Sequence, residues 1–495
     1  MANNNESPSP TADTITLGAN INLTSILPQI TSEITVEGAG FAIDGGGSVS
    51  LFNIGGAGDL TVNDATLQNG RSSGNGGAVV NNGTLTVNSS NISGNTTTFA
   101  GGAIHNAGTL RVNNSTISGN TANISSGGGI SNSGPLTVIN STFSGNSTPG
   151  SGGAISNNNI PLTVINSTFS GNSASSGGAI SNFQDSLTVT NSTFSGNSAS
   201  NGGAIFGQYA LSILNLAGNI FEKGTNGDNC VNSGPLNDNG YNLSDDGTCT
   251  NGGTGSVINA ALNLGTLADN GGPTLTHALL AGSAAFDTIP AGACSLSADQ
   301  RDVARPVNGS CDSGAYEGGT LVCSVSADNT YTFPQQSGVE IHVVSTTDLG
   351  CLYVEEMPLS HPNATGAGEG QALRTGKYWR IRALQDASGT TANSYVANLT
   401  LPHDNLNNPK ACKYTGGAGY GWECAADAST SSTVTRNGLT SFSDWAVGGD
   451  VGPTAVSLQS LSVTSTKQVG VWLAVLVMGL VTAVGLWRRR TGQSF

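Results

Sequence analysis

The stretch that decides the fold lies between residues 152 and 197, where one unit is written twice. It reads GGAISNNNIPLTVINSTFSGN over residues 152–172 and, after SASS, GGAISNFQDSLTVTNSTFSGN over residues 177–197. Both copies hold a glycine pair with Ala-Ile, a Leu-Thr-Val segment and a Phe-Ser-Gly-Asn end. Apolar and polar residues alternate within these short segments, which is the period of a β-strand, and Gly, Asn and Ser mark the turns.

The same unit recurs on both sides of this stretch. A GG(A/G)(I/V) tetrad begins at Gly76, Gly101, Gly127, Gly152, Gly177 and Gly202, so the period is 25 or 26 residues. A unit of short strands cannot bury its own apolar face, so the units must stack. We therefore predict an all-β fold, a right-handed parallel β-helix with about 25 residues per coil and coils about 4.8 Å apart. Asn at fixed turn positions would bond the next coil or adopt a left-handed backbone.

The pattern of the chain changes after the repeats. Beyond residue 320 the 25-residue period ends, basic residues return, and alternating segments are separated by Pro and Gly. This is typical of a small β-sandwich. The predicted organisation begins with a disordered N-terminus with a truncated start (1–12), β-helix repeats (13–225) and a β-helix end with a disulfide-containing cap (226–319). A β-sandwich-like domain (320–450), a linker (451–468), a transmembrane helix (469–487) and a cytoplasmic basic tail (488–495) follow.

Charge is sparse and acidic. Only 9% of the 495 residues are charged, the net charge is −15, and glycine accounts for 71 residues. Residues 1–320 hold 19 acidic residues and five basic ones, so no basic stripe is present to neutralise phosphates. We therefore expect no nucleic-acid partner.

The cysteines indicate disulfides. There are eight, none precedes Cys230, and no CxxC pair occurs. This favours an oxidising compartment over a zinc or thioredoxin motif; the alternative is eight free thiols in a cytosolic chain. Sequence neighbours suggest four pairs: Cys230 with Cys249, Cys294 with Cys311, Cys323 with Cys351, and Cys412 with Cys424.

The C-terminus carries a membrane signal. Val469 to Trp487 form 19 uncharged, mostly apolar residues, about the length that spans a bilayer as a helix. Arg488, Arg489 and Arg490 follow directly. By the positive-inside rule these arginines stay cytoplasmic, which predicts a cell-surface protein with its bulk outside the cell.

The sequence points to no catalytic, metal or cofactor site. Between residues 50 and 220 the charged residues are Asp59, Asp64, Arg71, Arg111 and Asp185, too scattered for the charge clusters of polysaccharide lyases and hydrolases. Gly70-Arg-Ser-Ser-Gly74 matches the G-x-S-x-G pattern but lacks its strand–turn–helix setting. The densest charges, which we expect to pair and close the solenoid end, are Asp287, Asp299, Arg301, Asp302, Arg305 and Asp312.

Two further groups admit a functional and a structural interpretation. The carboxylates of Asp228, Asp238, Asp245 and Asp246 are candidate Ca²⁺ ligands, but their spacing fits no EF-hand, and a solvated acidic turn is the alternative. Among the later segments, alternation would send Trp379 and Ile381 inward and Arg380 and Arg382 outward. Between Cys412 and Cys424, three aromatic side chains would form a loop core or stack on sugars: Tyr414, Tyr420 and Trp422.

The repeats resemble those of chlamydial polymorphic outer-membrane proteins. The resemblance rests on GGA(I/V) paired with FxxN, as in Gly152–Ile155 with Phe169–Asn172; Ile92 and Ile117 replace the Phe in two coils. It implies an adhesin, although the C-terminal β-barrel of that family is lacking in this sequence.

A second resemblance covers residues 226–317. The segments GYNL (240–243), DNGGPTLTHAL (269–279) and CDSGAYE (311–317) are similar to the end cap of bacterial choice-of-anchor surface proteins. That family implies a variable C-terminal anchor. It also implies that Ala2-Asn3-Asn4 ends a longer leader, so we expect this chain to lack its natural signal peptide and first coil.

We therefore expect a membrane-anchored, non-enzymatic extracellular adhesin or spacer. Its partners would be extracellular glycans or cell-surface proteins, reached through the polar ladders of the repeat. One alternative is a polysaccharide-binding or polysaccharide-degrading protein of pectate lyase type. The other is a purely structural envelope protein.

Overall fold

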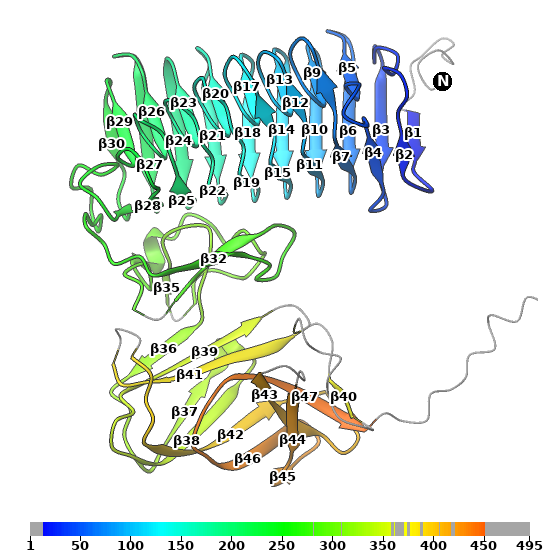
Figure 1. Ribbon diagram of the computed structural model, residues 1–495. Helices are drawn as coiled ribbons and strands as arrows, with labels where there is room; N and C mark the ends of the chain where they lie inside the picture. Colours follow the sequence, from blue (N-terminus) through cyan, green and yellow to red (C-terminus); the bar gives the residue numbers. More distant parts are fainter. Residues whose placement is uncertain are drawn as a thin grey trace, which may run out of the picture. The chain divides into compact units, whose positions relative to one another are not determined.

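The computed structural model describes residues 13–450 except 281, 308, 358–360, 362–370, 374–376, 387–389, 405 and 417–420. The described chain is built from β-strands and two short 3-10 helices. Its N-terminal part is a parallel β-solenoid of about nine turns with about 25 residues each, as the repeats predict (Figure 1). Strand pairing keeps the sequence period: Leu85 pairs with Leu110, and Leu162 pairs with Leu187.

Each coil contributes one strand to each main parallel sheet. Sheet 1 contains β1 (Asp13–Thr16), β3 (Glu33–Glu37), β6 (Asp59–Asn63), β10 (Thr84–Asn88), β14 (Thr109–Asn113), β18 (Leu136–Ile139), β21 (Leu162–Ile165), β24 (Asp185–Thr190), β27 (Ser212–Ala217) and β30 (Leu236–Asp238). Sheet 2 contains β2 (Ile21–Asn22), β4 (Ala42–Asp44), β7 (Thr66–Gln68), β11 (Asn91–Ser93), β15 (Thr116–Ser118), β19 (Thr142–Ser144), β22 (Thr168–Ser170), β25 (Thr193–Asn197), β28 (Ile220–Lys223) and β31 (Leu243–Ser244).

Two further sheets close the coils. Sheet 3 contains β5 (Phe52–Ile54), β9 (Val79–Asn81), β13 (Ile104–Asn106), β17 (Ile130–Asn132), β20 (Ile155–Asn157), β23 (Ile180–Asn182), β26 (Ile205–Gly207) and β29 (Cys230–Asn232). Sheet 4 is short and contains β8 (Arg71–Ser72), β12 (Thr96–Thr97) and β16 (Thr121–Ala122).

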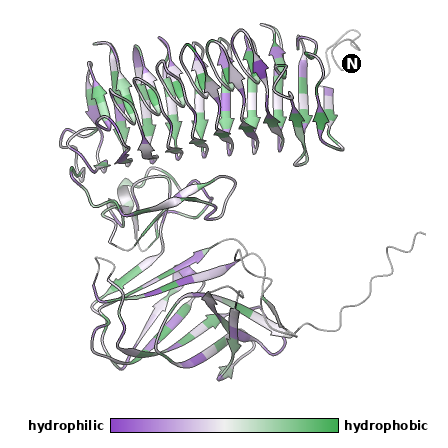
Figure 2. Cartoon of the chain, viewed as in Figure 1, coloured by the Kyte–Doolittle hydropathy of each residue, from purple (hydrophilic) through white to green (hydrophobic). Residues whose placement is uncertain are grey.

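The solenoid core consists of stacked identical side chains. Leu and Val of sheet 1 alternate with outward polar residues, and Figure 2 shows apolar positions recurring from coil to coil. In sheet 2, Ile92 and Ile117 lead into a stack of buried phenylalanines. The stack contains Phe143, Phe169, Phe194 and Phe221, and the ring centroids of successive pairs are 4.9, 4.8 and 5.1 Å apart. These distances match the spacing between coils.

Asparagine serves two separate purposes. The Asn that ends each repeat is buried and bonds the next coil, as in Asn120 Nδ2 to Asn146 Oδ1 at 2.9 Å. The left-handed backbone occurs instead at a different set of Asn residues, Asn114, Asn140, Asn166 and Asn191. Thus the predicted inter-coil bond and the predicted left-handed turn are both present. They coincide at Asn166, whose Nδ2 donates to Asn140 Oδ1 at 2.9 Å, but not in the buried row.

The glycine pair is required by close approach of neighbouring coils. Gly101 has a φ of +74°, which favours glycine. At Gly102 an added Cβ would lie 2.0 Å from the carbonyl oxygen of Gly128 in the next coil. The first glycine therefore sets the turn and the second leaves room for the adjacent backbone.

Residues 245–319 follow the last solenoid strand. They contain β32 (Leu264–Ala268), β33 (Thr276–Leu279), β34 (Ile289–Pro290), the 3-10 helix η1 (Ala291–Ala293) and β35 (Ser310–Cys311). Part of this segment lies against the outer face of sheet 2. Thr142 donates to the Leu275 carbonyl at 2.6 Å, and Thr168 donates to Gln300 Oε1 at 2.7 Å. The segment thus covers hydroxyl side chains that the repeat would otherwise expose.

Residues 320–450 form two antiparallel sheets. One contains β36 (Thr320–Cys323), β39 (Cys351–Met357), β41 (Tyr378–Leu384), β47 (Asp444–Asp450), β43 (Lys410–Gly416) and β44 (Gly421–Ala425), with β40 (Gln371–Leu373) beside β47. The other contains β37 (Asn329–Phe333), β38 (Val339–Thr346), β42 (Tyr395–Pro402), β46 (Thr433–Leu439) and β45 (Ala428–Ser429); η2 (Pro334–Gln336) follows β37. Both sheets contribute to one apolar cluster that includes Trp379 and Trp445.

Four disulfides connect the pairs expected from sequence neighbours: Cys230–Cys249, Cys294–Cys311, Cys323–Cys351 and Cys412–Cys424. The predicted span Val469–Trp487 and the arginines after it lie outside the described residues. Within the described part of the chain, no helix has the length and apolar character needed to cross a membrane.

Candidate functional site

The densest group of charged side chains lies where residues 299–317 meet β39 and β41. Arg301 is buried and forms an ion pair with Asp299 at 2.7 Å, and its guanidinium stacks 3.5 Å from the centroid of the Tyr316 ring. Asp299 also accepts hydrogen bonds from the backbone N–H groups of Val303 and Glu317. These contacts hold the turn that carries Arg301.

Glu355 of β39 completes this group. Its carboxylate accepts hydrogen bonds from the hydroxyls of Tyr316 and Tyr353 and forms an ion pair with Arg380 at 3.1 Å. Arg301 Nη1 lies 3.7 Å from Glu355 Oε1. Burial would lower the pKa of Arg301, but Asp299, Tyr316 and Glu355 outweigh it, so the pKa is raised. The guanidinium therefore stays charged.

Two neighbouring carboxyls are held by backbone groups. Glu317 accepts from the N–H of Val307 at 3.0 Å and of Asp312 at 2.9 Å, and Arg305 Nε lies 3.5 Å from it. Asp312 accepts from Asp287 and Gly318. Burial, together with the charge of Glu317, raises the pKa of Asp312 well above its usual value.

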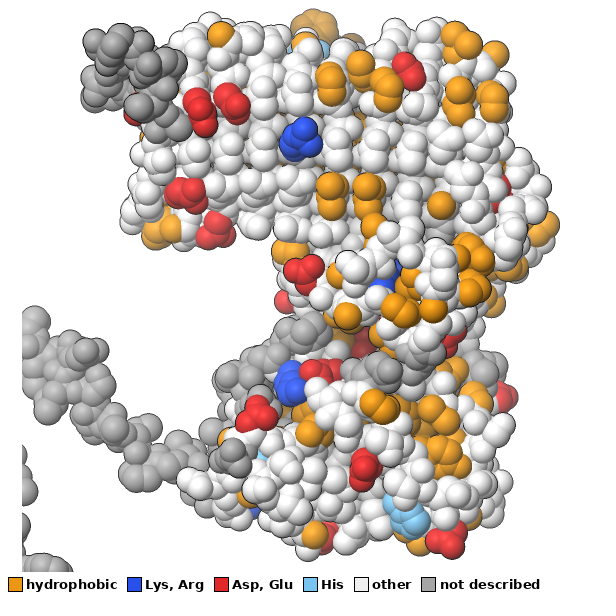
Figure 3. All heavy atoms as spheres, turned by 180° about the vertical axis from the view of Figure 1, so that it is seen from behind, with side chains coloured by type: hydrophobic (Ala, Val, Ile, Leu, Met, Phe, Trp, Pro, Cys, Tyr) orange, Lys and Arg blue, Asp and Glu red, His pale blue; other side chains and the backbone are white. Residues whose placement is uncertain are grey.

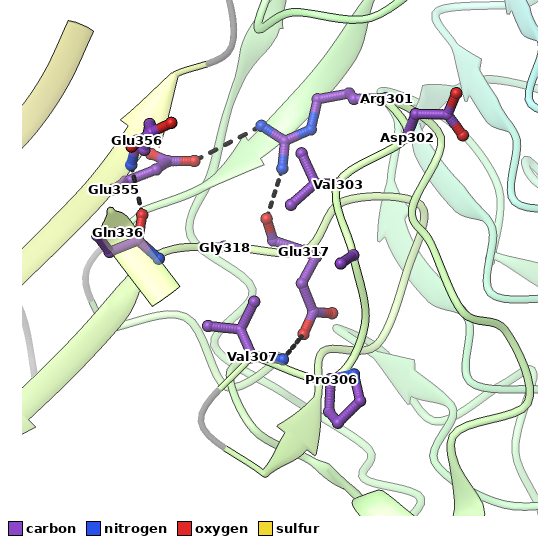
Figure 4. A pocket seen from close by; sticks show the side chains of 11 residues that line it. Arg301, Asp302, Val303, Pro306, Val307, Glu317, Gly318, Gln336, Glu355 and Glu356 are labelled. Atoms are coloured by element: carbon purple, nitrogen blue, oxygen red, sulfur yellow. Dashed lines mark hydrogen bonds and ion pairs between the residues drawn. The ribbon is translucent and has the colours of Figure 1, made fainter. Parts of the chain in front are cut away.

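A pocket of about 380 Å³ opens beside this group (Figure 4). Its lining residues include Arg301, Glu317, Gln336, Glu355 and Glu356. Figure 4 shows that Arg301 is turned toward Glu355 and the Glu317 backbone. Most polar groups of the wall thus bind one another, as in a structural network, but Glu356 Oε2 is buried without a hydrogen-bond partner among the described residues.

The predicted pairing of the cap charges is only part of what the structure shows. Arg301 pairs with Asp299 as expected, but Arg305 pairs with Glu317 and not with a predicted aspartate. Glu317 and Glu355, which were not among the predicted residues, take central positions. Asp302 is exposed. Glu355 is distant in sequence from the cap and lies on β39, whose residues are nearly all buried, so no local alternation indicated it.

The candidate calcium ligands lie around the Cys230–Cys249 disulfide. Asp238 accepts five hydrogen bonds, including 2.7 Å bonds from Asn242 and Ser256. Burial alone would raise the pKa of Asp238, but these hydrogen bonds lower it. Asp246 is held in the same way by Ser244, Thr248 and the Asn229 backbone. Among the described residues, no three His, Cys, Asp or Glu side chains are grouped to hold a metal ion.

The aromatic and basic residues of β41 alternate as predicted. Trp379 and Ile381 are fully buried, while Arg380 and Arg382 lie on the other face and pair with Glu355 and Asp444. Tyr414 and Trp422 pack together, with ring centroids 5.3 Å apart, and both contact His361. They belong to the hairpin β43–β44 instead of a loop; Tyr420 lies outside the described residues.

The solenoid surface is polar and nearly uncharged. Figure 3 shows one face on which uncharged side chains and backbone predominate and charged groups are few. Outward rows of like residues run along this part of the chain; in sheet 1 one row contains Thr61, Thr86, Arg111, Thr137, Thr163 and Thr188. Such rows offer many equivalent hydrogen-bonding groups at the coil spacing.

The repeats match a known family of repeats. A profile described as the Chlamydia polymorphic membrane protein repeat matches residues 140–158, 166–182 and 191–208. The three matches fall on successive coils and include Phe143, Phe169 and Phe194 or the turns beside them. No curated protein and no solved structure matches the chain.

Proposed function

We propose that this chain is a surface-exposed, adhesin-like protein in which the solenoid serves as a rigid binding scaffold. The observation that carries the proposal is the match of three successive coils to the repeat of a polymorphic membrane protein family. The stacked Phe and Asn rows support it, since they fix the coils relative to one another and keep the outward rows in register. A rigid row of repeated polar groups favours binding through many weak contacts.

We further propose that the protein acts by binding and not by catalysis. The carboxylates of the densest charged group support this, because Asp299, Glu317 and Glu355 are each engaged by several donors of the chain itself. A general acid or base needs a free edge toward a substrate. Partners would be extracellular glycans or proteins of a cell surface.

The proposal also covers the membrane anchor, the domain before it and the handedness of the solenoid. The resemblance of residues 226–317 to choice-of-anchor proteins and the apolar stretch 469–487 support attachment by a C-terminal transmembrane helix, with the bulk of the chain outside. The two sheets of residues 320–450 are proposed to form a β-sandwich-like domain between the solenoid and this anchor, and the solenoid is proposed to be right-handed.

The test is labelling of the full chain on intact cells of its native host. A biotin reagent that cannot cross membranes should label the chain in intact cells as strongly as in lysed cells. A cytosolic protein of the same cells serves as the control and should be labelled after lysis alone. Labelling of the chain that also requires lysis would contradict the surface location.

A further inference from the structure

One groove of the solenoid contains an arginine surrounded by hydroxyl groups. The groove has a volume of about 280 Å³ and lies at the start of sheet 4, beside Arg71 on β8. Its apolar wall consists of Ile26 and Val49. The rest of its lining carries side-chain hydroxyls: Ser48, Ser50, Ser72, Ser73 and Thr98.

Arg71 is exposed and makes no ion pair with any of the described residues. The other two basic residues of the solenoid differ from it. Lys223 is paired with Asp228 at 3.1 Å, and Arg111 stands in the outward row of sheet 1. On the preceding coil, the carboxylate of Asp44 accepts hydrogen bonds from Gln68 and Asn69.

A row of hydroxyl groups leads away from Arg71 along the coils. Arg71 pairs in register with Thr96, and Thr96 with Thr121. Isolated bridges extend the row through Ser147, Ser173 and Ser198. The hydroxyls of Thr121 and Ser147 are 3.3 Å apart, so neighbouring members of the row lie within reach of one bound group.

We propose that Arg71 and its surrounding hydroxyls bind the oxyanion of an acidic glycan, a carboxylate or a sulfate ester, and that the row from Thr96 to Ser198 contacts the sugar hydroxyls. A planar guanidinium offers paired donors that fit a carboxylate or sulfate, and serine and threonine hydroxyls add further donors. Serine and threonine hydroxyls can also both donate hydrogen bonds to the hydroxyls of a sugar chain and accept hydrogen bonds from them.

The charge of the molecule narrows the ligand class further. With a net charge of −15 and one unpaired cation in the groove, the protein is unsuited to a dense polyanion such as a nucleic acid. A glycan with widely spaced anionic groups places one of them on Arg71 and its neutral hydroxyls on the row. This inference rests on the proposed function and specifies the ligand class of that binding scaffold.

The test is calorimetric titration of the full chain in detergent with three defined probes. The probes are a galactose hexamer that carries one galacturonic acid residue, the methyl ester of that hexamer and a galactose hexamer that carries one sulfate group. The esterified hexamer has the same sugar backbone without the charge. We expect one or both acidic probes to bind about ten-fold tighter than the ester; which of them binds identifies a carboxylate or a sulfate as the ligand group.

Variants then assign the binding to the groove. Arg71→Gln should weaken binding of the acidic probe about ten-fold, and Arg71→Lys should weaken it less, because the ammonium keeps the charge but loses the paired donors. Lys410→Gln is the control, since it removes one positive charge from β43, outside the solenoid and its polar rows, and should leave the affinity unchanged. Arg71 is exposed, so these variants keep the fold, which circular dichroism verifies.

Three results would overturn the proposal. They are failure of both acidic probes to bind, equal binding of the esterified hexamer, and equal losses of affinity in Arg71→Gln and Lys410→Gln. The surface-labelling test is independent of the titration. If the chain binds the acidic hexamer but is labelled only after lysis, the glycan site is supported and the surface location is contradicted. If the chain is labelled on intact cells but binds no acidic probe, the surface location is supported and the glycan site is contradicted.

Discussion

Asn146 donates a hydrogen bond from its side-chain nitrogen to Oδ1 of Asn172, one coil further along the solenoid, over 3.0 Å. The same nitrogen donates to the Ile117 carbonyl at 2.8 Å, and Oδ1 of Asn146 accepts a hydrogen bond from the backbone N–H of Asn120. This one side chain thus satisfies buried polar groups of both neighbouring coils. These hydrogen bonds to the adjacent coils explain why each repeat ends in Asn.

Asn146→Ala should destabilise the solenoid strongly. The substitution leaves several buried polar groups without partners, and each costs about 1–3 kcal/mol, so we expect a loss of at least about 3 kcal/mol in the free energy of unfolding. Urea denaturation followed by far-ultraviolet circular dichroism measures it. Asn88→Ala is the control, because Asn88 bonds Asn63 on the half-buried outer face, and should cost less than about 1 kcal/mol. Equal effects would contradict the account of the buried row.

Gly102→Ala should disrupt the stacking of coils. Its Cβ would lie 2.0 Å from the Gly128 carbonyl oxygen, so neighbouring backbones must separate. Gly119→Ala is the comparison variant: Gly119 has a positive φ, +61°, which Gly102 lacks, but no atom lies within 4 Å of the added Cβ, so this change tests backbone strain without a clash. We expect Gly119→Ala to cost about 1–2 kcal/mol from backbone strain and Gly102→Ala to cost clearly more. Thermal denaturation of both variants, compared with the wild type, decides this.

Glu355→Gln should weaken the packing of β39 against residues 299–317. Glu355 is buried, and the change removes the charge that faces Arg380 and Arg301. Breaking one partner of a buried ion pair costs about 3–5 kcal/mol. The adjacent Glu356→Gln removes one ion pair, with Lys377, in which the side chains are 20% and 24% exposed, and should cost less than Glu355→Gln. Guanidinium denaturation curves of the two variants should therefore separate, and overlapping curves would refute a structural role for Glu355.

Asp238 should make the end of the solenoid sensitive to acid. Burial opposes its charge, but five hydrogen bonds lower its pKa below the ordinary value of 3.8. A carboxyl with a lowered folded pKa stabilises the protein above its unfolded pKa, and that contribution disappears as the pH falls through the folded value. Asp238→Asn should therefore lose stability at neutral pH and approach the wild type as the pH falls below 3.8 and through the lowered pKa of Asp238. Urea midpoints measured from pH 7 to pH 2 test this; a constant difference would contradict it.

The periodic part of the fold could be predicted from the sequence because each coil repeats the same solution. The tetrads at Gly101 and Gly127 fix a turn, Leu110 and Val112 point inward, and the register follows from the 26-residue spacing. The disulfides were predictable for a related reason: each cysteine pairs with the next one along the chain, so no long-range information was needed.

The nonperiodic contacts could not be predicted in this way. Gln300 bonds Thr168 across 132 residues, and His277 bonds Ser170 across 107, with no local pattern that links them. The groove at Arg71 could not be predicted because its residues belong to the repeat and do not stand out from it in sequence. Its hydroxyls come from neighbouring coils at unremarkable turn positions, and only stacking brings Ser48, Ser72 and Thr98 together.

The central claim is that the protein binds surface ligands without changing them. The most direct measurement incubates the full chain in detergent with arrays of acidic and neutral polysaccharides and of cell-surface proteins. Retention of the chain and release of reducing or unsaturated sugar ends are scored in the same samples. We predict retention on at least one ligand with no release of sugar ends above a heat-denatured control. Release that exceeds this control and increases with protein concentration would contradict the claim, because it would show that the protein is an enzyme acting on polysaccharide.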